Sequence, residues 1–186
     1  IYFKDFDYII APGDFCSDKL RKYMFEALKK KLANPKAKVN WFDLIGKKRA
    51  KKMVDKSLKD GRKILEFLNS FNKTVILVPG NWDWTEDEDS SWDYLRKDHY
   101  SKLIKGLENL RDIYHSLLID DKFCFIGHGI TSGPEYPQYK EDLKIYSKKE
   151  LKSMKKDFNH QFNNLSKLFH AGKLSENPII FLSHNV

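Results

Sequence analysis

The sequence predicts an α/β fold. Short apolar runs that are typical of buried strands alternate with longer amphipathic stretches of helical periodicity. Two of the apolar runs stop at a Pro-Gly pair, and three of them are followed closely by an aspartate, an asparagine or a histidine. No repeat and no Pro- or Ser-rich linker divides the 186 residues, so we expect one domain, 1–186.

Five segments have the composition of strands. Three are compact apolar or β-branched runs, which suit a sheet that is covered on both faces. The other two adjoin each other across Asp120-Asp121, where a hairpin is expected. The predicted strands are Asp7–Ala11, Thr74–Val78, Ile113–Ile119, Lys122–Ile130 and Pro178–Leu182.

Four segments have the pattern of helices. Ser17-Asp18 offers an N-cap for a helix that runs to about Ala33, just before Asn34-Pro35. Its expected apolar positions are Leu20, Met24, Phe25, Leu28 and Leu32. A long helix is expected over Leu44–Phe71, with Gly61 as an interruption and a buried stripe of Val54, Leu58, Ile64, Leu65 and Leu68. A short helix is expected over Tyr94–Leu107, and a charged one over Ser147–Phe169, where Ser147 and Glu150 form a capping box.

Composition narrows the class of protein. The net charge of +8 favours contact with anions such as phosphate esters, nucleic acid or an acidic membrane face. Cys16 and Cys124 form neither a disulfide framework nor a zinc-type spacing, so a reducing, cytoplasmic location is expected. No apolar run approaches transmembrane length, and nothing in the sequence indicates the oligomeric state. Because the chain opens without methionine and closes just after an apolar strand, we expect both ends to be cut.

Three predicted strands each lead to a polar side chain. Asp14 follows the strand Asp7–Ala11, Asn81 follows Thr74–Val78, and His184 follows Pro178–Leu182. Because ligands bind at the carboxyl ends of strands in α/β sheets, these side chains are expected to share one crevice. A carboxylate, an amide oxygen and an imidazole suit manganese, iron or zinc. Taken singly, Asp14 and Asn81 are better explained as turn residues or caps, and His184 as a surface histidine.

These residues carry a family resemblance. Gly13-Asp14, then Gly80-Asn81-Trp82-Asp83, then Ser183-His184 resemble, in order and spacing, the central motifs of calcineurin-like metallophosphoesterases. The resemblance spans nearly the whole chain. It implies two sheets sandwiched between helices, truncated here at both ends, and a hydrolase that acts on a phosphorylated substrate. It also implies two divalent metal ions, with Asp14 bridging both and with Asn81 and His184 on the second.

The sequence departs from the family pattern in three places. The opening Asp-x-His motif and the closing Gly-His-x-His motif of the family are absent from this sequence. We therefore expect this chain to hold a partial site and to be inactive or nearly so by itself. The histidine that usually follows the asparagine is Trp82, which can neither transfer a proton nor bind a metal. Either another group supplies the proton, or the fold has become a scaffold or a nucleic-acid-binding module.

Two further residues are expected to have supporting roles. His128 lies between two glycines and is the candidate to replace the lost proton donor, although a loop histidine without a role explains it as simply. Asp83 is expected to hold the loop or to hydrogen-bond the ligands. The basic stretches 29–31 and 47–52 either track a nucleic-acid backbone or form the solvated faces of helices.

Overall fold

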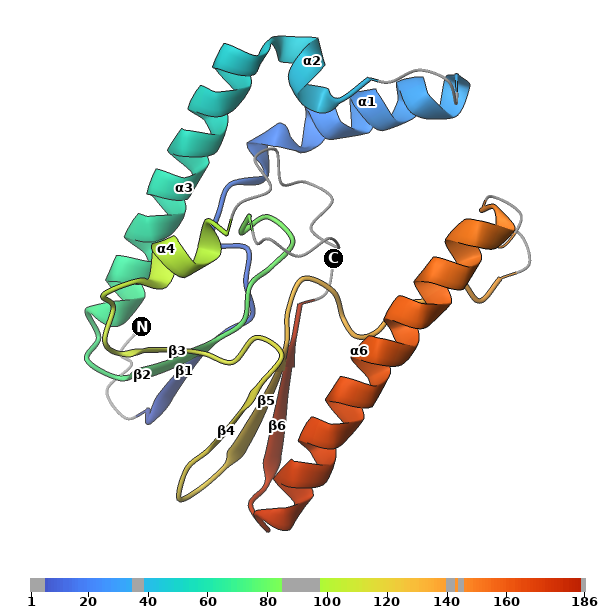
Figure 1. The fold of residues 1–186 in the computed structure, drawn as a ribbon. Helices are drawn as coiled ribbons and strands as arrows, with labels where there is room; N and C mark the ends of the chain where they lie inside the picture. The colour runs from blue at the N-terminus through green and yellow to red at the C-terminus, as the bar shows by residue number, and fades with distance from the viewer. Residues whose placement is uncertain (1–5, 35–38, 85–97, 140–142, 144–145, 185–186) are drawn as a thin grey trace.

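The computed structural model describes residues 6–34, 39–84, 98–139, 143 and 146–184. Over these residues the chain has a mixed α/β architecture with two small sheets and helices beside them (Figure 1). The strands are β1 (Tyr8–Ala11), β2 (Thr74–Leu77), β3 (Leu110–Asp112), β4 (Leu117–Ile119), β5 (Cys124–His128) and β6 (Ile179–Ser183). The helices are the 3₁₀ turn η1 (Asp18–Leu20), then α1 (Arg21–Ala33), α2 (Trp41–Ile45), α3 (Lys47–Asn69), α4 (Tyr100–Ile104) and α6 (Lys148–Leu174).

The first sheet contains β1, β2 and β3 in that order, and all three strands are parallel. Its register pairs Ala11 with Leu77, so the loops after β1 and β2 start side by side. The central strand β2 is buried from Val75 onward, which explains its uniformly apolar sequence.

The second sheet has the order β4-β5-β6. β4 and β5 are antiparallel and form the hairpin predicted at Asp120-Asp121, closed by a bond from the Asp120 amide to the Phe123 carbonyl. β6 joins parallel to β5, with Ser183 opposite His128. The carboxyl ends of β5 and β6 therefore lie together.

The two sheets pack face to face. Ile76 and Val78 on the first sheet share a buried cluster with Phe125 and Leu182 on the second. The alternate residues Val75 and Leu77 belong to a different cluster with the helices. A hydrogen bond also joins the two sheets, because the Tyr8 hydroxyl donates to the Asp120 carboxylate. This bond raises the pKa of Tyr8 to about 12. Because strand side chains alternate between faces, the order of layers is helices, first sheet, second sheet, helix. In Figure 1 these layers run from α3 to α6.

Helix α3 covers the outer face of the first sheet without a break, so the predicted interruption at Gly61 is wrong. Gly61 is instead a site of close approach, because a Cβ there would lie 2.8 Å from the Cys16 sulfur. The predicted helix start at Leu44 is also displaced, since α2 ends at Ile45 and α3 begins after Gly46. In the predicted stripe, Val54 and Leu65 are buried, but Ile64 is exposed.

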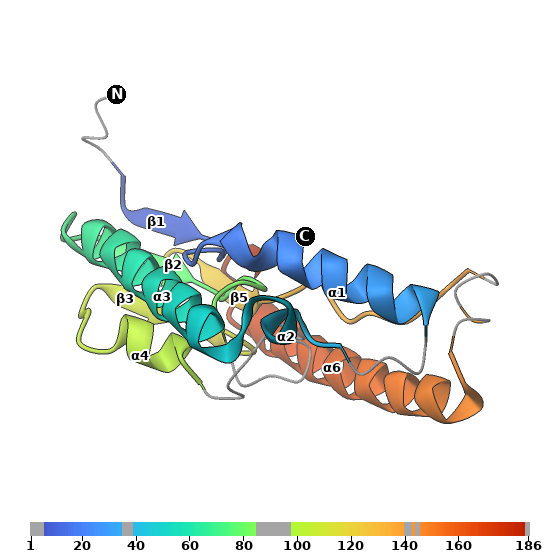
Figure 2. The ribbon, with the colours of Figure 1, turned by 90° about the horizontal axis from the view of Figure 1, so that it is seen from above.

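Helix α1 ends at Ala33 as predicted, and Ser17 caps the 3₁₀ turn that precedes it. Its apolar stripe is only half buried. Leu20 and Met24 lie in the core, whereas Phe25, Leu28 and Leu32 are exposed. The reason is visible in Figure 2, where α1 extends past the strands and α2 lies between it and α3.

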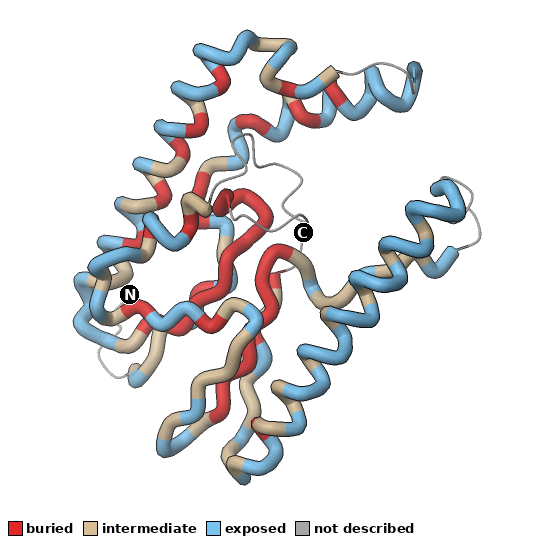
Figure 3. Tube along the Cα trace, viewed as in Figure 1, coloured by how far each residue is buried: buried red, intermediate tan, exposed pale blue. Residues whose placement is uncertain are grey.

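Helix α6 covers the outer face of the second sheet. Its start agrees with the prediction, because Ser147 and Glu150 form the capping box. The helix continues beyond the predicted end at Phe169 to Leu174. Gly172 is its one buried residue and faces Cys124, Ile126 and Ile179. Figure 3 shows α6 largely exposed, with burial concentrated in β2, β5 and the turns after them.

Only the end of the strand predicted over Ile113–Ile119 is observed, as β4, and the predicted start at Ile113 is wrong. The chain turns between β3 and β4 as it passes from one sheet to the other, with His115 at a φ of 49°. Asp112 stabilises the turn because its side chain accepts a bond from the Tyr114 amide. The helix predicted over Tyr94–Leu107 is reduced to α4 among the described residues, and the prediction for 94–97 falls outside them.

No described helix is both long enough and apolar enough to cross a membrane.

Candidate metal centre

Two glycines allow the loops after β1 and β2 to touch. A Cβ on Gly13 would lie 2.1 Å from the Gly80 nitrogen, and one on Gly80 would lie 2.2 Å from Asp14 Oδ1. Gly13 has a φ of 91°, and Asp14 follows with a φ of 59°, a conformation that non-glycine residues rarely adopt. The Pro-Gly pairs at the strand ends thus bring the Asp14 loop against the Gly80 loop. Backbone strain of this kind is concentrated at functional sites.

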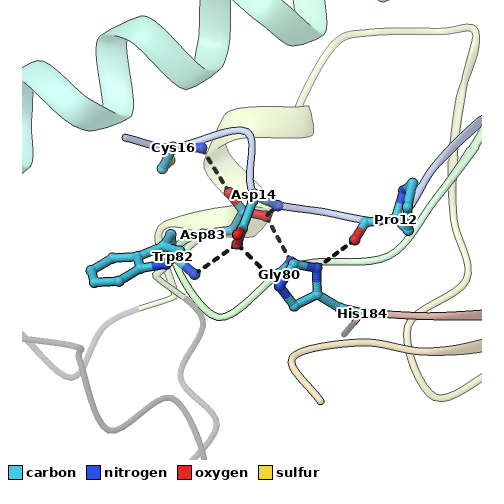
Figure 4. A network of polar contacts seen from close by, with 7 residues as sticks. All are labelled: Pro12, Asp14, Cys16, Gly80, Trp82, Asp83 and His184. Atoms are coloured by element: carbon cyan, nitrogen blue, oxygen red, sulfur yellow. Dashed lines mark hydrogen bonds and ion pairs between the residues drawn. The ribbon is translucent and has the colours of Figure 1, made fainter. Parts of the chain in front are cut away.

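Asp83 fixes this junction. Its carboxylate accepts three backbone amides, from Asp14 at 2.9 Å, Cys16 at 2.9 Å and Gly80 at 2.7 Å (Figure 4). The side chain is fully buried, and burial raises its pKa to about 6 although the three amides oppose this shift. Asp83 therefore has the loop-holding role that the sequence predicts for it.

Asp14 extends from this junction with its side chain 38% exposed. Its Oδ1 accepts a bond from the Trp82 backbone amide at 3.3 Å. The same oxygen lies 3.4 Å from Nε2 of His184. The ends of β1 and β6, which belong to different sheets, are thereby brought together as the sequence predicts.

His184 is oriented by its other ring nitrogen. Nδ1 donates to the Pro12 carbonyl over 2.7 Å, since a carbonyl can only accept. In the neutral ring, Nε2 then carries the lone pair and points at the Asp14 carboxylate (Figure 4). The 3.4 Å separation is longer than an ordinary hydrogen bond. The Asp14 carboxylate also raises the pKa of His184, so a cation between the two groups, whether proton or metal, is favoured.

Asn81 is buried beside these groups, between Gly80 and Trp82, which both contact Asp14. Its side-chain oxygen is inaccessible to solvent and has no hydrogen-bond partner among the residues that the structure describes. A buried polar atom left in this state is costly unless something binds it. An amide oxygen is a suitable ligand for a hard or borderline cation.

These three side chains therefore supply some of the ligands that a metal ion needs. Asp14, Asn81 and His184 offer two oxygens and one nitrogen, and the Pro12 bond to His184 is the supporting contact that metal-bound histidines commonly have. Within the described ranges, no three His, Cys, Asp or Glu side chains come close enough to hold a metal. Among the described residues, Asn81 is therefore the third side-chain ligand that this candidate site offers beside Asp14 and His184.

Trp82 is a packing residue. Its side chain is 5% exposed and belongs to the core cluster between the helices and the first sheet. Trp82 also lines a cavity of about 350 Å³, together with Asp14 and Asp60. The indole thus stands beside the candidate centre, where the resembling family has a histidine.

His128 points to the other side of its sheet. Phe125 and Gly127 face the first sheet, so alternation turns His128 toward the opposite face, away from the face of Leu182 and His184. Its Nε2 lies 3.3 Å from the Thr131 hydroxyl oxygen, and its ring packs edge-on against His115 at 5.2 Å. The role of His128 as the replacement proton donor stays a prediction.

One supporting residue was not singled out from the sequence. The Ser57 hydroxyl of α3 accepts a bond from the Ser17 amide at 2.8 Å and donates to the Ser17 carbonyl at 3.3 Å. It thereby ties α3 to the loop that carries Asp14. The available signal was a serine in helical register with Val54, Gly61 and Leu65, on the buried stripe.

Neither a protein-family model nor a curated protein matches this chain. The chain is similar to a solved crystal structure with 14% sequence identity and a TM-score of 0.45. The similarity covers 71% of this chain and 45% of that one, so the chain spans less than half the length of that protein. Similarity at this level assigns no family, and the interpretation of the site depends on its own geometry.

Proposed function

We propose that this chain is part of a divalent-metal-dependent phosphoester hydrolase of the calcineurin-like type. The observation that carries the proposal is the 3.4 Å approach of His184 Nε2 to Asp14 Oδ1 at the ends of strands from two different sheets. The Asn81 oxygen beside them, which has no partner among the described residues, supports it. A layered order of helix, sheet, sheet and helix, as observed here, is also what the resemblance implies.

Each residue has a distinct task in this proposal. Asp14, Asn81 and His184 would hold the metal, while the Pro12 carbonyl keeps the lone pair of His184 directed inward. The Asp83 carboxylate and the Trp82 amide hold Asp14 in position. A bound divalent ion would supply charge that polarises a phosphoryl oxygen and lowers the pKa of a bound water.

The proposal for the chain alone is narrower than for the complete enzyme. The two motifs that supply the remaining ligands in the resembling family are absent from this sequence. We therefore propose two ions for the full-length protein and one partial site here, with little or no turnover by this chain alone.

A second function is favoured by Trp82. Because this tryptophan is packed into the core, the position of the usual histidine has become structural. A phosphoesterase fold retained as a scaffold would have this feature. The two functions differ in whether the full-length protein hydrolyses phosphoesters.

The decisive experiment has two arms. Titration of this chain with Mn²⁺ should show one site that Asp14→Asn weakens at least tenfold and that the control Asp157→Asn, on exposed α6, leaves unchanged. The full-length protein should hydrolyse an aryl phosphodiester with Mn²⁺, Fe²⁺ or Zn²⁺, and Asp14→Asn should abolish this. Metal binding without turnover would support the scaffold, and absence of both would refute the proposal.

A further inference from the structure

A basic groove begins beside the candidate metal centre. It has a volume of about 650 Å³ and lies between the first turns of α1 and the start of α3. Four cationic side chains line it against a single carboxylate, Asp18. The cationic residues are Lys19, Arg21, Lys22 and Arg49.

These cations are not used to stabilise the helices. Other exposed pairs along α1 and α3, such as Lys51–Asp55 and Lys56–Asp60, are ion pairs one turn apart. Among the described residues, none of the four groove cations forms a salt bridge, and Asp18 is not paired with any of them. Lys19 acts electrostatically on Asp60, whereas the positive charges of Arg21, Lys22 and Arg49 are available to a ligand.

Aromatic side chains alternate with these cations. The Arg21 guanidinium lies 5.4 Å from the centre of the Phe25 ring, and the Lys22 ammonium lies 4.8 Å from that of Tyr23. The Tyr23 hydroxyl is in turn 3.4 Å from an Arg49 nitrogen. Phe25 remains 42% exposed although it is a large apolar residue. Tyr23 is half-buried, so Phe25 is the exposed ring of the groove. Proteins bind single-stranded nucleic acids in positively charged grooves with aromatic rings on which bases stack.

The groove continues into the candidate centre. Asp18 and Arg21 line both the groove and the cavity of about 350 Å³ that contains Asp14. The charge changes sign along this path. The inner end holds the carboxylates Asp14 and Asp18, the Asp60 carboxylate that pairs with Lys56, and Arg21, whereas the outer end is dominated by cations. An anionic chain that binds the outer end thus leads toward a site that attracts metal ions.

We infer that the groove binds the backbone of a single-stranded nucleic acid and delivers a phosphodiester to the Asp14–His184 centre. The second half of this inference rests on the proposed hydrolase, whereas the first half does not. A phosphopeptide carries one phosphate and would use one or two cations. Four cations with interleaved rings match a repeating phosphate chain whose bases are free to stack.

Binding is tested on this chain without divalent metal, so that its outcome is independent of hydrolysis. A fluorescein-labelled oligothymidylate of about 12 nucleotides, in the usual range of site sizes, is titrated in EDTA and read by anisotropy. The expected Kd is on the order of 10⁻⁴ to 10⁻⁶ M at physiological salt. The triple variant Arg21→Ala, Lys22→Ala, Arg49→Ala should weaken binding at least tenfold. The negative slope of log K against log salt should also become smaller in magnitude by about 2. Each of the three removed cations leaves one phosphate without a partner, and each such phosphate contributes about 0.7 to the slope.

Two further variants locate the binding. The charge-matched control Lys152→Ala, Lys156→Ala, Lys167→Ala removes three exposed cations from α6 and should change affinity less than twofold. Phe25→Ala keeps every charge, and it should weaken binding about fivefold or more if a base stacks on the ring, with no change in the salt slope.

Three outcomes would overturn the inference. These are no detectable binding, equal losses of affinity in the groove and α6 triple variants, or tighter binding of a phosphopeptide than of the oligonucleotide at the groove. If oligonucleotide binding fails while the full-length protein hydrolyses an aryl phosphodiester, the hydrolase stands and only the nucleic-acid substrate is refuted. Groove-dependent binding without turnover would refute the delivery step and keep the binding surface.

Discussion

Asp14 Oδ1 and His184 Nε2 face each other across 3.4 Å although they end strands of different sheets. The approach exists because the sheets pack face to face and because the Pro12 carbonyl turns the imidazole inward. A carboxylate that faces a nitrogen lone pair favours a cation between the two groups, and the raised pKa of His184 reflects this. Protonation of His184 and metal binding are thus alternative ways of filling the same gap.

The first prediction concerns this competition. Because Asp14 raises the pKa of His184, protons should displace Mn²⁺ at a higher pH than an ordinary imidazole would require. Affinity for Mn²⁺ should fall by about tenfold per pH unit once the pH is below that pKa. Calorimetric titration of this chain at a series of pH values measures the trend. His184→Ala should abolish tight binding at every pH, and His160→Ala on exposed α6 should not; an unchanged affinity in His184→Ala would exclude this ligand.

Gly80 is predicted to be irreplaceable because the Asp14 loop lies against it. A methyl group at Gly80 would lie 2.2 Å from Asp14 Oδ1 and 2.4 Å from the Asp14 nitrogen, so the loops must separate. Gly80→Ala should lower the free energy of unfolding by about 1–3 kcal/mol and should also weaken Mn²⁺ binding. The control Gly133→Ala has open space and should be near neutral by both measures. Equal melting temperatures for the two variants would contradict the close approach.

The strand ends were predictable because the signals that define them are local. A polar residue that closely follows an apolar run is expected at the edge of a sheet. Asp14 and Asn81, which come after Pro-Gly pairs, and His184, which comes after Ser183, all lie just beyond the ends of strands. Strand pairing is not local. The sequence did not indicate which face of its sheet His128 would occupy, because that depends on the register with β6.

Gly61 and the exposed residues Phe25 and Ile64 illustrate the same limit, because their surroundings depend on distant parts of the chain. Gly61 has the sequence signature of a helix interruption, yet α3 runs through it. The glycine is needed there because Cys16 lies too close for a side chain. Phe25 and Ile64 match the apolar period of their helices but remain exposed. Periodicity predicts that a face is apolar, and only the tertiary arrangement decides whether a neighbour covers it.

Gly172 provides a test of the packing of α6 on the second sheet. A Cβ there would lie 3.0 Å from the Cys124 sulfur and 3.2 Å from Ile126 Cδ1. Gly172→Val should therefore destabilise the protein by about 1–3 kcal/mol through overpacking. Lys173→Val, at the adjacent exposed position, should cost only the helix propensity of valine, about 0.5 kcal/mol. Urea unfolding of both variants gives the comparison, and similar midpoints would mean that α6 does not contact the sheet at this residue.

Asp83 should give the fold a characteristic dependence on pH. Its pKa in the folded protein is about 6, above the ordinary value of 3.8, because burial penalises the carboxylate. The folded state thus binds a proton more tightly than the unfolded state does. The stabilisation from this proton is complete below about pH 4 and is lost as the pH rises through about 6.

Asp83→Asn removes the titrating group while keeping the shape of the side chain. The amide cannot accept from all three backbone N–H groups, so the variant should be less stable by about 1–3 kcal/mol at low pH. The deficit should shrink by up to about 3 kcal/mol between pH 4 and pH 7, because only the wild type loses stability over this range. Urea unfolding of both proteins in EDTA measures the difference and cancels the other titrating groups. A deficit that grows with pH would mean that the three amides outweigh burial and that Asp83 is held as a carboxylate throughout.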